Sequence, residues 1–142
     1  MTFTPVESHT IKSVKLLLSK TGSPGTINVS IKATSGGLPT GSALCSGTLS
    51  GSSVGTSQAW YEITLGSGTS LTGGTKYVIL VDVRTGDASN HIHWHRNTAG
   101  GYGGGNAVLS SDSGVSYADG SPIDFCFEDW GTTTYLAGGG GG

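Results

Sequence analysis

The chain carries little charge. Only 11% of its 142 residues are Asp, Glu, Lys or Arg, and the formal net charge is −2, whereas about a quarter of the residues is usual. The seven Lys and Arg are scattered along the chain, which excludes the clustered basic surface of a nucleic-acid-binding protein. No apolar run approaches the roughly 20 residues that span a bilayer. We therefore expect neither nucleic acid as a partner nor insertion into a membrane.

The first ten residues, "MTFTPVESHT", lack a positively charged segment followed by an apolar core. We therefore expect no secretory signal peptide. The chain would then be released by another route, such as lysis of a cell by a virus, or it would be a domain taken from a longer protein. We expect an extracellular or virion-surface location.

The 26 glycines separate short apolar runs such as "VKLLL", "INVSI", "YEITL" and "KYVILVDV". Alternation of apolar and polar residues in these runs is typical of half-buried strands. In "INVSIKAT", for example, Ile27, Val29 and Ile31 share one face. We expect turns at "TGSPG" (21–25) and "SGGLPTGS" (35–42), and no helix. The pattern predicts an all-β antiparallel sandwich of about eight or nine short strands, with jelly-roll topology favoured. Residues 1–135 would form one domain and residues 136–142 a glycine-rich tail or linker.

Three segments resemble jelly-roll modules of the choice-of-anchor and carbohydrate-binding-module type, which occur in phage and bacterial surface proteins. The segments contain "GLPTGSALCSGTL", the Trp-led strand before "LTGGTKYVI", and "SSDSG" before "DFCF". The resemblance covers nearly the whole chain and specifies fold better than function. It implies a surface binding or structural part and not an enzyme, and it assigns no functional residues.

The stretch "HIHWHRN" places His91, His93 and His95 at alternate positions of an expected strand, with Ile92 and Trp94 on its core face. Neighbouring imidazoles on one strand face can converge on a metal, but zinc needs three or four ligands, and no acid follows in "RNTAGGYGG". The favoured interpretation is a solvent-facing row. Such a row would charge together near pH 6 and adjust binding to an acidic partner.

Other patterns that suggest chemistry are weaker. Asp112, Asp119 and Asp124 lie in loop-like segments that could offer oxygen ligands to calcium, although turn formation also explains these residues; no other cofactor is expected. "GSSVG" (51–55) matches the G-x-S-x-G pattern around Ser53, but no helix follows, so no catalytic residue is expected. Cys45 and Cys126 fit no metal spacing. The sequence leaves open whether they are two separate thiols or form a disulfide.

Exposed aromatic side chains are the remaining candidates for a binding site. Trp60 and Trp130 fall on the opposite phase from the core residues of their strands, and Tyr102 lies in a glycine-rich loop. These rings could stack on sugars or cover a second interface. We expect a non-catalytic structural or attachment domain that assembles with other protein subunits, copies of itself among them. A carbohydrate-binding module that uses these aromatics is the alternative.

Overall fold

The structure of this protein is a computed structural model that describes residues 1–97, 102–111, 114–120 and 123–133. These residues form twelve strands and one turn of 3-10 helix, and none of them lies in an α-helix. No helix among them is long and apolar enough to cross a membrane. The prediction of an all-β chain is confirmed.

The strands differ widely in length. The longer ones are β2 (His9–Thr21), β3 (Ile27–Ser35), β4 (Leu38–Leu49), β5 (Ala59–Leu71), β6 (Tyr77–Asp82), β7 (His91–Trp94) and β12 (Phe127–Thr133). The two-residue strands are β1 (Thr2–Phe3), β8 (Arg96–Asn97), β9 (Val108–Leu109), β10 (Ala118–Asp119) and β11 (Asp124–Phe125), and the 3-10 turn is η1 (Gly51–Ser53). The structure therefore replaces the expected eight or nine short strands with a few long strands and several very short ones.

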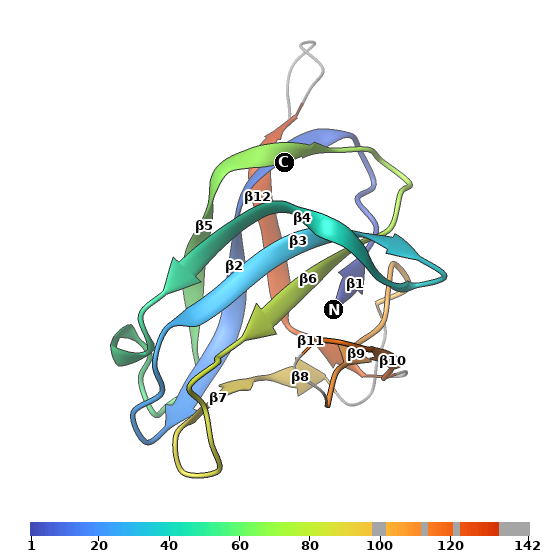
Figure 1. The fold of residues 1–142 in the computed structure, drawn as a ribbon. Coiled ribbons are helices and arrows are strands. Elements are labelled where there is room, and N and C mark those ends of the chain that lie inside the picture. Colours follow the sequence, from blue (N-terminus) through green and yellow to red (C-terminus); the bar gives the residue numbers. More distant parts are fainter. Residues whose placement is uncertain (98–101, 112–113, 121–122, 134–142) are drawn as a thin grey trace.

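Two antiparallel sheets face each other (Figure 1). One has the strand order β1-β6-β3-β4, and the other has the order β12-β2-β5 with β7 also paired to β2. Strand β12 pairs with the first part of β2 and β7 with its last part, while β5 lies along the other side of β2. The short strands form the pairs β9–β10 and β8–β11. The antiparallel sandwich is thus confirmed, and the jelly-roll topology stays a prediction.

The core lies between the two sheets and is built from alternate residues of each long strand. Residues two apart point to the same side of a strand. The buried residues of the long strands are spaced in this way, so the predicted alternation is confirmed. Full burial of each such side chain contributes about 1.5–3 kcal/mol to stability. The core residues below 2% exposure include Val14, Leu16 and Leu18 of β2, Ile27, Val29 and Ile31 of β3, Ile63 and Leu65 of β5, and Ile79 of β6.

Two strands run through residues that usually break them. Strand β4 begins at Leu38, immediately after the Gly36–Gly37 turn, and continues through Pro39. Of the turn expected at 35–42, only Gly36 and Gly37 form a turn, and residues 38–42 belong to β4. Strand β5 continues to Leu71 through Gly66, whose φ is 60°. Both strands lie at an edge of their sheet, where proline and irregular glycines are tolerated because one side needs no ladder partner.

The two sheets approach each other closely along β4 and β5. A Cβ atom on Gly47 of β4 would collide with the backbone carbonyl of Thr64 on β5. Only glycine therefore fits at this point of the seam. A hollow lies beside β6, lined by Val81, Trp94 and Phe125 among others.

Candidate functional site

The two exposed tryptophans lie on the same outer face of one sheet. Trp130 of β12 pairs with Ser13 of β2, and Trp60 of β5 pairs with Leu17 of β2. Ser13 and Leu17 are four residues apart on one strand, so all four side chains point the same way. The exposed fractions of Trp60 and Trp130 are 47% and 43%. The predicted outward orientation of both tryptophans is therefore correct.

Three charged side chains lie between the tryptophans. Lys15 of β2 pairs with Glu62 on one side and Glu128 on the other. Its Nζ lies 4.5 Å from the centroid of the Trp130 ring, within the range of a cation–π contact. The Trp130 Nε1–H donates to Glu128 Oε1 at 2.8 Å, and Ser13 Oγ donates to Glu62 Oε2 at 2.6 Å. The contacts with Lys15 and Glu128 hold the Trp130 ring in one orientation.

We call this surface the tryptophan face and define it by Ser13, Lys15, Leu17, Trp60, Glu62, Glu128 and Trp130. Along β2 it spans four residues, about 13 Å, and across the sheet it spans two strand spacings, about 10 Å. The sequence did not indicate Lys15, Glu62 or Glu128 as members. Their alternation with core residues was the available signal, but only the strand register shows that they meet.

The histidine row extends the tryptophan face along β7. His93 pairs with Ser19 and His91 pairs with Thr21 of β2, so the imidazoles continue the same outer surface. The ring centroids of His91 and His93 lie 4.6 Å apart, and those of His93 and His95 lie 6.3 Å apart. Ile92 and Trp94, the intervening residues, pack against the core. The imidazoles thus lie on the outer side, as predicted, but only His93 is exposed, and His91 and His95 are half-buried.

His93 and His95 lie within hydrogen-bond distance of hydroxyl groups of β2, whereas His91 Nδ1 lies 3.2 Å from the Asp87 carbonyl oxygen. Ser19 Oγ lies 2.8 Å from His95 Nε2, and Thr21 Oγ1 lies 3.0 Å from His93 Nε2. Within the described parts of the chain, no group of three or more His, Cys, Asp or Glu side chains could hold a metal ion. The arrangement therefore gives the histidines a role in the surface and offers no support for zinc.

Two of the three calcium candidates, Asp119 and Asp124, lie in the described residues. Asp119 is exposed on β10. Asp124 is buried and accepts a hydrogen bond of 2.9 Å from the Tyr102 backbone N–H. Asp112 lies outside the described residues, so the calcium site stays a prediction. In the structure, Asp124 fixes the backbone at Tyr102.

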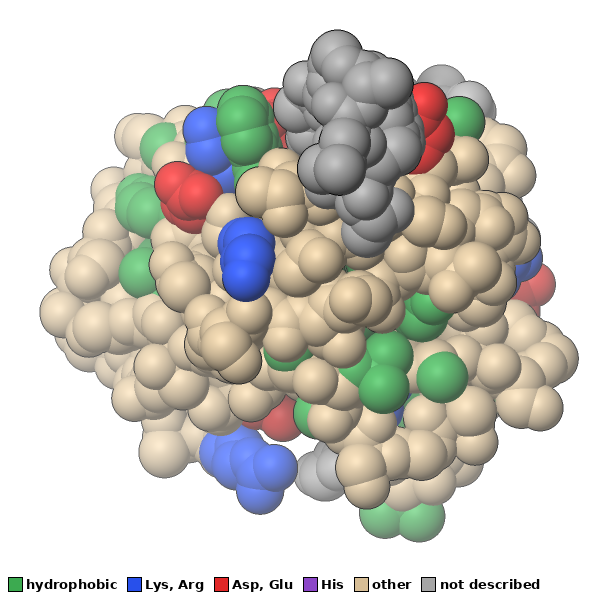
Figure 2. Space-filling view, turned by 90° about the horizontal axis from the view of Figure 1, so that it is seen from above, with side chains coloured by type: hydrophobic (Ala, Val, Ile, Leu, Met, Phe, Trp, Pro, Cys, Tyr) green, Lys and Arg blue, Asp and Glu red, His purple; other side chains and the backbone are tan. Residues whose placement is uncertain are grey.

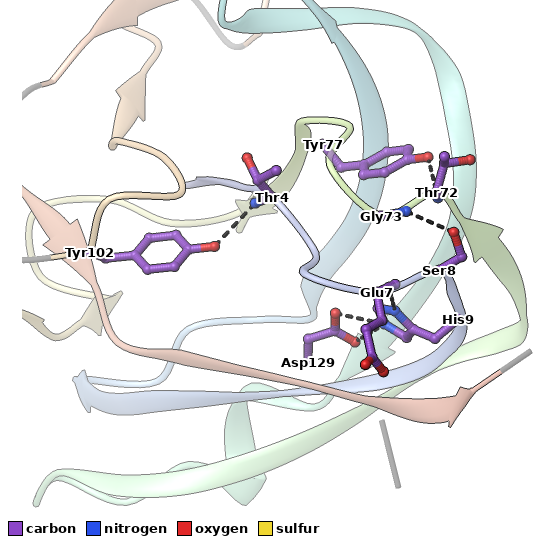
Figure 3. Close-up of polar contacts among 9 residues, drawn as sticks. All are labelled: Thr4, Glu7, Ser8, His9, Thr72, Gly73, Tyr77, Tyr102 and Asp129. Carbon is purple, nitrogen blue, oxygen red and sulfur yellow. Dashed lines mark hydrogen bonds and ion pairs between the residues drawn. The ribbon is translucent and has the colours of Figure 1, made fainter. Parts of the chain in front are cut away.

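Tyr102 does not belong to the tryptophan face. Its hydroxyl accepts a hydrogen bond of 3.1 Å from the Thr4 backbone N–H (Figure 3). Its ring meets the Phe127 ring edge-on, with centroids 5.6 Å apart, and Phe127 itself pairs with the buried Leu16 on the inner side of the sheet. Tyr102 is 39% exposed, but its ring lies against Phe127 and apart from the tryptophan face, so a binding role for Tyr102 stays a prediction.

A partly buried ion pair, which the sequence did not indicate, joins β2 to β12. His9 Nε2 lies 2.8 Å from the Asp129 carboxylate, and His9 Nδ1–H donates to the Glu7 carbonyl at 3.0 Å (Figure 3). The two side chains are 7% and 17% exposed. Burial alone lowers the pKa of His9, but the hydrogen bonds to Glu7 and Asp129 and the Asp129 charge outweigh it and raise the pKa of His9 above its usual value. The imidazolium form is therefore favoured.

The two cysteines are free thiols. Cys45 of β4 pairs with the buried Ile31 and packs against the core, so its side chain points inward. Cys126 lies between Phe125 and Phe127, and alternation turns it to the outer side of the other sheet. Of the two alternatives that the sequence left open, the structure has the separate thiols. Burial raises the pKa of the Cys45 thiol to about 11, which makes it a poor nucleophile.

The comparisons with known proteins show no family for this chain. A scan against protein-family models finds no match, and searches of the curated proteins and of the solved structures find none either. The resemblance to jelly-roll surface modules therefore stays a prediction that is based on the segments quoted above.

The G-x-S-x-G pattern lacks the local structure of a hydrolase nucleophile. Ser53 ends the single turn η1, and the next residue, Val54, has extended backbone with φ −91° and ψ 132°. A nucleophile elbow needs a strand before the serine and a helix after it. The tryptophan face therefore remains the strongest candidate functional site in the described residues.

Proposed function

We propose that this protein is a non-catalytic structural or attachment domain of a virion or cell surface, and that it assembles with copies of itself through the tryptophan face. One observation carries the proposal: two exposed tryptophans flank a strand on a single sheet face. Tryptophan is among the residues that contribute most to binding energy at protein interfaces. An exposed pair on one face thus favours an interface over a plain solvated surface.

The charges on this face suit a symmetric pair of copies. In a two-fold interface the same patch meets itself, so it must carry both partners of each contact. Lys15 has Glu62 and Glu128 beside it in the register, so that Lys15 of one copy can meet a glutamate of the other. The low charge of the chain, 11% of its residues, also opposes association little. Figure 2 shows few Lys, Arg, Asp or Glu side chains on the face that it draws.

Sedimentation velocity over a wide range of protein concentration tests this proposal. The wild-type chain should show a concentration-dependent dimer or larger species, and the double variant Trp60→Ala/Trp130→Ala should remain a monomer. Leu44→Ala is the matched control, because Leu44 is 42% exposed on β4 of the other sheet, and it should associate like the wild type. Equal association of all three proteins would contradict the proposal.

Carbohydrate binding is the second candidate, and the fixed Trp130 ring favours it. Sugar rings stack their C–H faces on a flat indole, and nearby polar groups bind the hydroxyls. Glu128 holds the indole edge, and Lys15, Glu62 and the histidines could serve as the polar groups. A protein that stays monomeric, binds a glycan array and loses this binding in Trp60→Ala and in Trp130→Ala separately would establish this alternative.

A further inference from the structure

A groove beside strand β6 runs along the free edge of this strand and continues over the outer face of β3 and β4, where Asn28, Ser30 and Thr48 line it. Two adjoining hollows of about 1450 Å³ and about 410 Å³ share Val81, Asp82, Val83, Gly86 and Trp94 as lining residues. The larger hollow exceeds the roughly 300–1,000 Å³ of typical small-molecule sites. Strands β8 and β11 lie beyond this edge of β6 (Figure 1). The volume of the groove therefore suits a ligand larger than a typical small molecule.

The edge of β6 offers unused backbone hydrogen-bonding groups to this groove. Strand β1 covers only the start of that edge, where the Met1 amino group donates to the Ile79 carbonyl and the Ile79 N–H donates to the Met1 carbonyl, both at 2.9 Å. Along a strand, residues two apart direct their N–H and C=O groups to the same side. Val81 therefore points its N–H and C=O away from β3 and into the groove. No described residue hydrogen-bonds to them there.

Aromatic side chains form the apolar part of the groove. Trp94 of β7 and Phe125 of β11 are stacked, with centroids 4.6 Å apart and an interplanar angle of 19°, and both line the larger hollow. The Trp94 Nε1–H is already used, because it donates to the Cys126 carbonyl at 2.9 Å. The stack thus presents apolar surface to whatever enters beside Val81.

We propose that this groove binds an extended peptide segment of a partner protein, which adds to the sheet beside β6. Such a segment would run antiparallel to β6, in line with β1, exchange hydrogen bonds with Val81, and place an apolar side chain against Trp94 and Phe125. Adding a strand to a free sheet edge is a common mode of peptide recognition. The continuity with β1 favours a peptide over a sugar, because this chain already adds a strand to the same edge.

The site is separate from the tryptophan face, since Trp94 points inward from β7 and the histidines point outward. The two surfaces can therefore be tested independently. Asp82 and Arg84 lie near one end of the groove, 3.8 Å apart, and supply charges of both signs. We expect peptides without net charge to bind best.

The test uses the pair of variants Val81→Pro and Val81→Ala. Proline removes the N–H that faces the groove and leaves the β3 ladder intact, because Val81 is not hydrogen-bonded to β3 through that group. Alanine keeps the N–H and is the matched control for the lost side chain. The probes are hexapeptides blocked at both ends that alternate Thr with Val, Ile, Leu or Phe, titrated by calorimetry, with circular dichroism as the check on folding.

At least one such hexapeptide should bind the wild type and Val81→Ala with similar affinity and bind Val81→Pro about tenfold more weakly, the effect of one hydrogen bond. The bound peptide should also slow hydrogen exchange of the Val81 amide in the wild type. If Val81→Pro does not fold, this exchange measurement tests the proposal in its place. Trp60→Ala/Trp130→Ala should leave peptide binding unchanged, whatever its association state. Equal affinity for both Val81 variants, unchanged Val81 exchange at saturation, or no binding by any hexapeptide would overturn the proposal.

Discussion

Replacing Asp129 by asparagine should remove the contribution of His9 to the pH dependence of this protein's stability near neutrality. His9 hydrogen-bonds to Glu7 through Nδ1–H and faces the Asp129 carboxylate through Nε2. A neutral histidine has only one N–H. With that proton on Nδ1, the Nε2 lone pair would face the carboxylate. The substituted asparagine side chain would still occupy the same volume but would no longer favour the charged imidazole.

The size and sign of the effect follow from these contacts. A hydrogen bond to a charged group is worth about 1.5–3 kcal/mol, which corresponds to about 5–10 °C in melting temperature for a chain of this size. Because the folded-state pKa of His9 is raised, the folded protein holds a proton that the unfolded chain releases. The contribution is complete below the unfolded pKa of about 6.5 and is lost as the pH rises through the folded pKa.

Thermal unfolding from pH 5.5 to 8.5 measures this effect in wild type and Asp129→Asn. The difference in melting temperature should be largest at pH 5.5 and shrink toward pH 8.5. Asp82→Asn is the control, because Asp82 is 54% exposed and its pair with Arg84 spans 3.8 Å, so its loss should have little effect at any pH. The reasoning would be refuted by a constant difference across this range, or by a His9 ring that titrates in NMR below pH 6.5.

Further predictions concern packing and thiol chemistry. Gly47→Ala should cost about 1–3 kcal/mol in chemical denaturation, because the new methyl group must displace backbone at the seam between the sheets, whereas Gly103→Ala has open space around it and should cost less. A thiol reagent should count two free thiols per chain when the protein is unfolded in guanidinium without reductant. In the native protein at pH 8, Cys45 should react far more slowly than in the unfolded chain, because a pKa of about 11 leaves roughly one thiolate in a thousand. Trp94→Ala should cost about 3 kcal/mol, while Trp60→Ala should change stability by less than about 0.5 kcal/mol; equal losses would contradict the assignment of the two rings to opposite sides of the sheet.

The faces of the strands could be predicted from the sequence, because side-chain alternation is local. On β7, Ile92 and Trp94 pack toward the core and the histidines point outward, as the alternation indicates. The pairing of β9 with β10 likewise joins two strands that are close in the sequence. Each of these features depends only on neighbouring residues.

The ends of the strands could not be predicted in the same way. Pro39 and Gly66 are usual chain breakers, but they lie in β4 and β5. These strands are at sheet edges, where a missing N–H or a bulge costs little. The edge position is a property of the whole fold, so the local sequence does not reveal it.

Contacts across the sheets were equally inaccessible from the sequence. His9 and Asp129 are 120 residues apart, and only the register of β2 with β12 brings them together. The same holds for Lys15 between its two glutamates, and for the hollow beside Val81, which depends on where β1 ends. The sequence indicated Trp60 and Trp130, but not the surface that they share.

The most direct test of self-assembly through the tryptophan face exchanges its charges between copies. Lys15→Glu and the double variant Glu62→Lys/Glu128→Lys should each be monomeric in sedimentation velocity, because like charges would then meet across the two-fold interface. An equimolar mixture of the two proteins should associate again, since lysines and glutamates are once more opposed. Association of either protein alone at the wild-type level, or a mixture that stays monomeric while the wild type associates, would contradict the proposed interface.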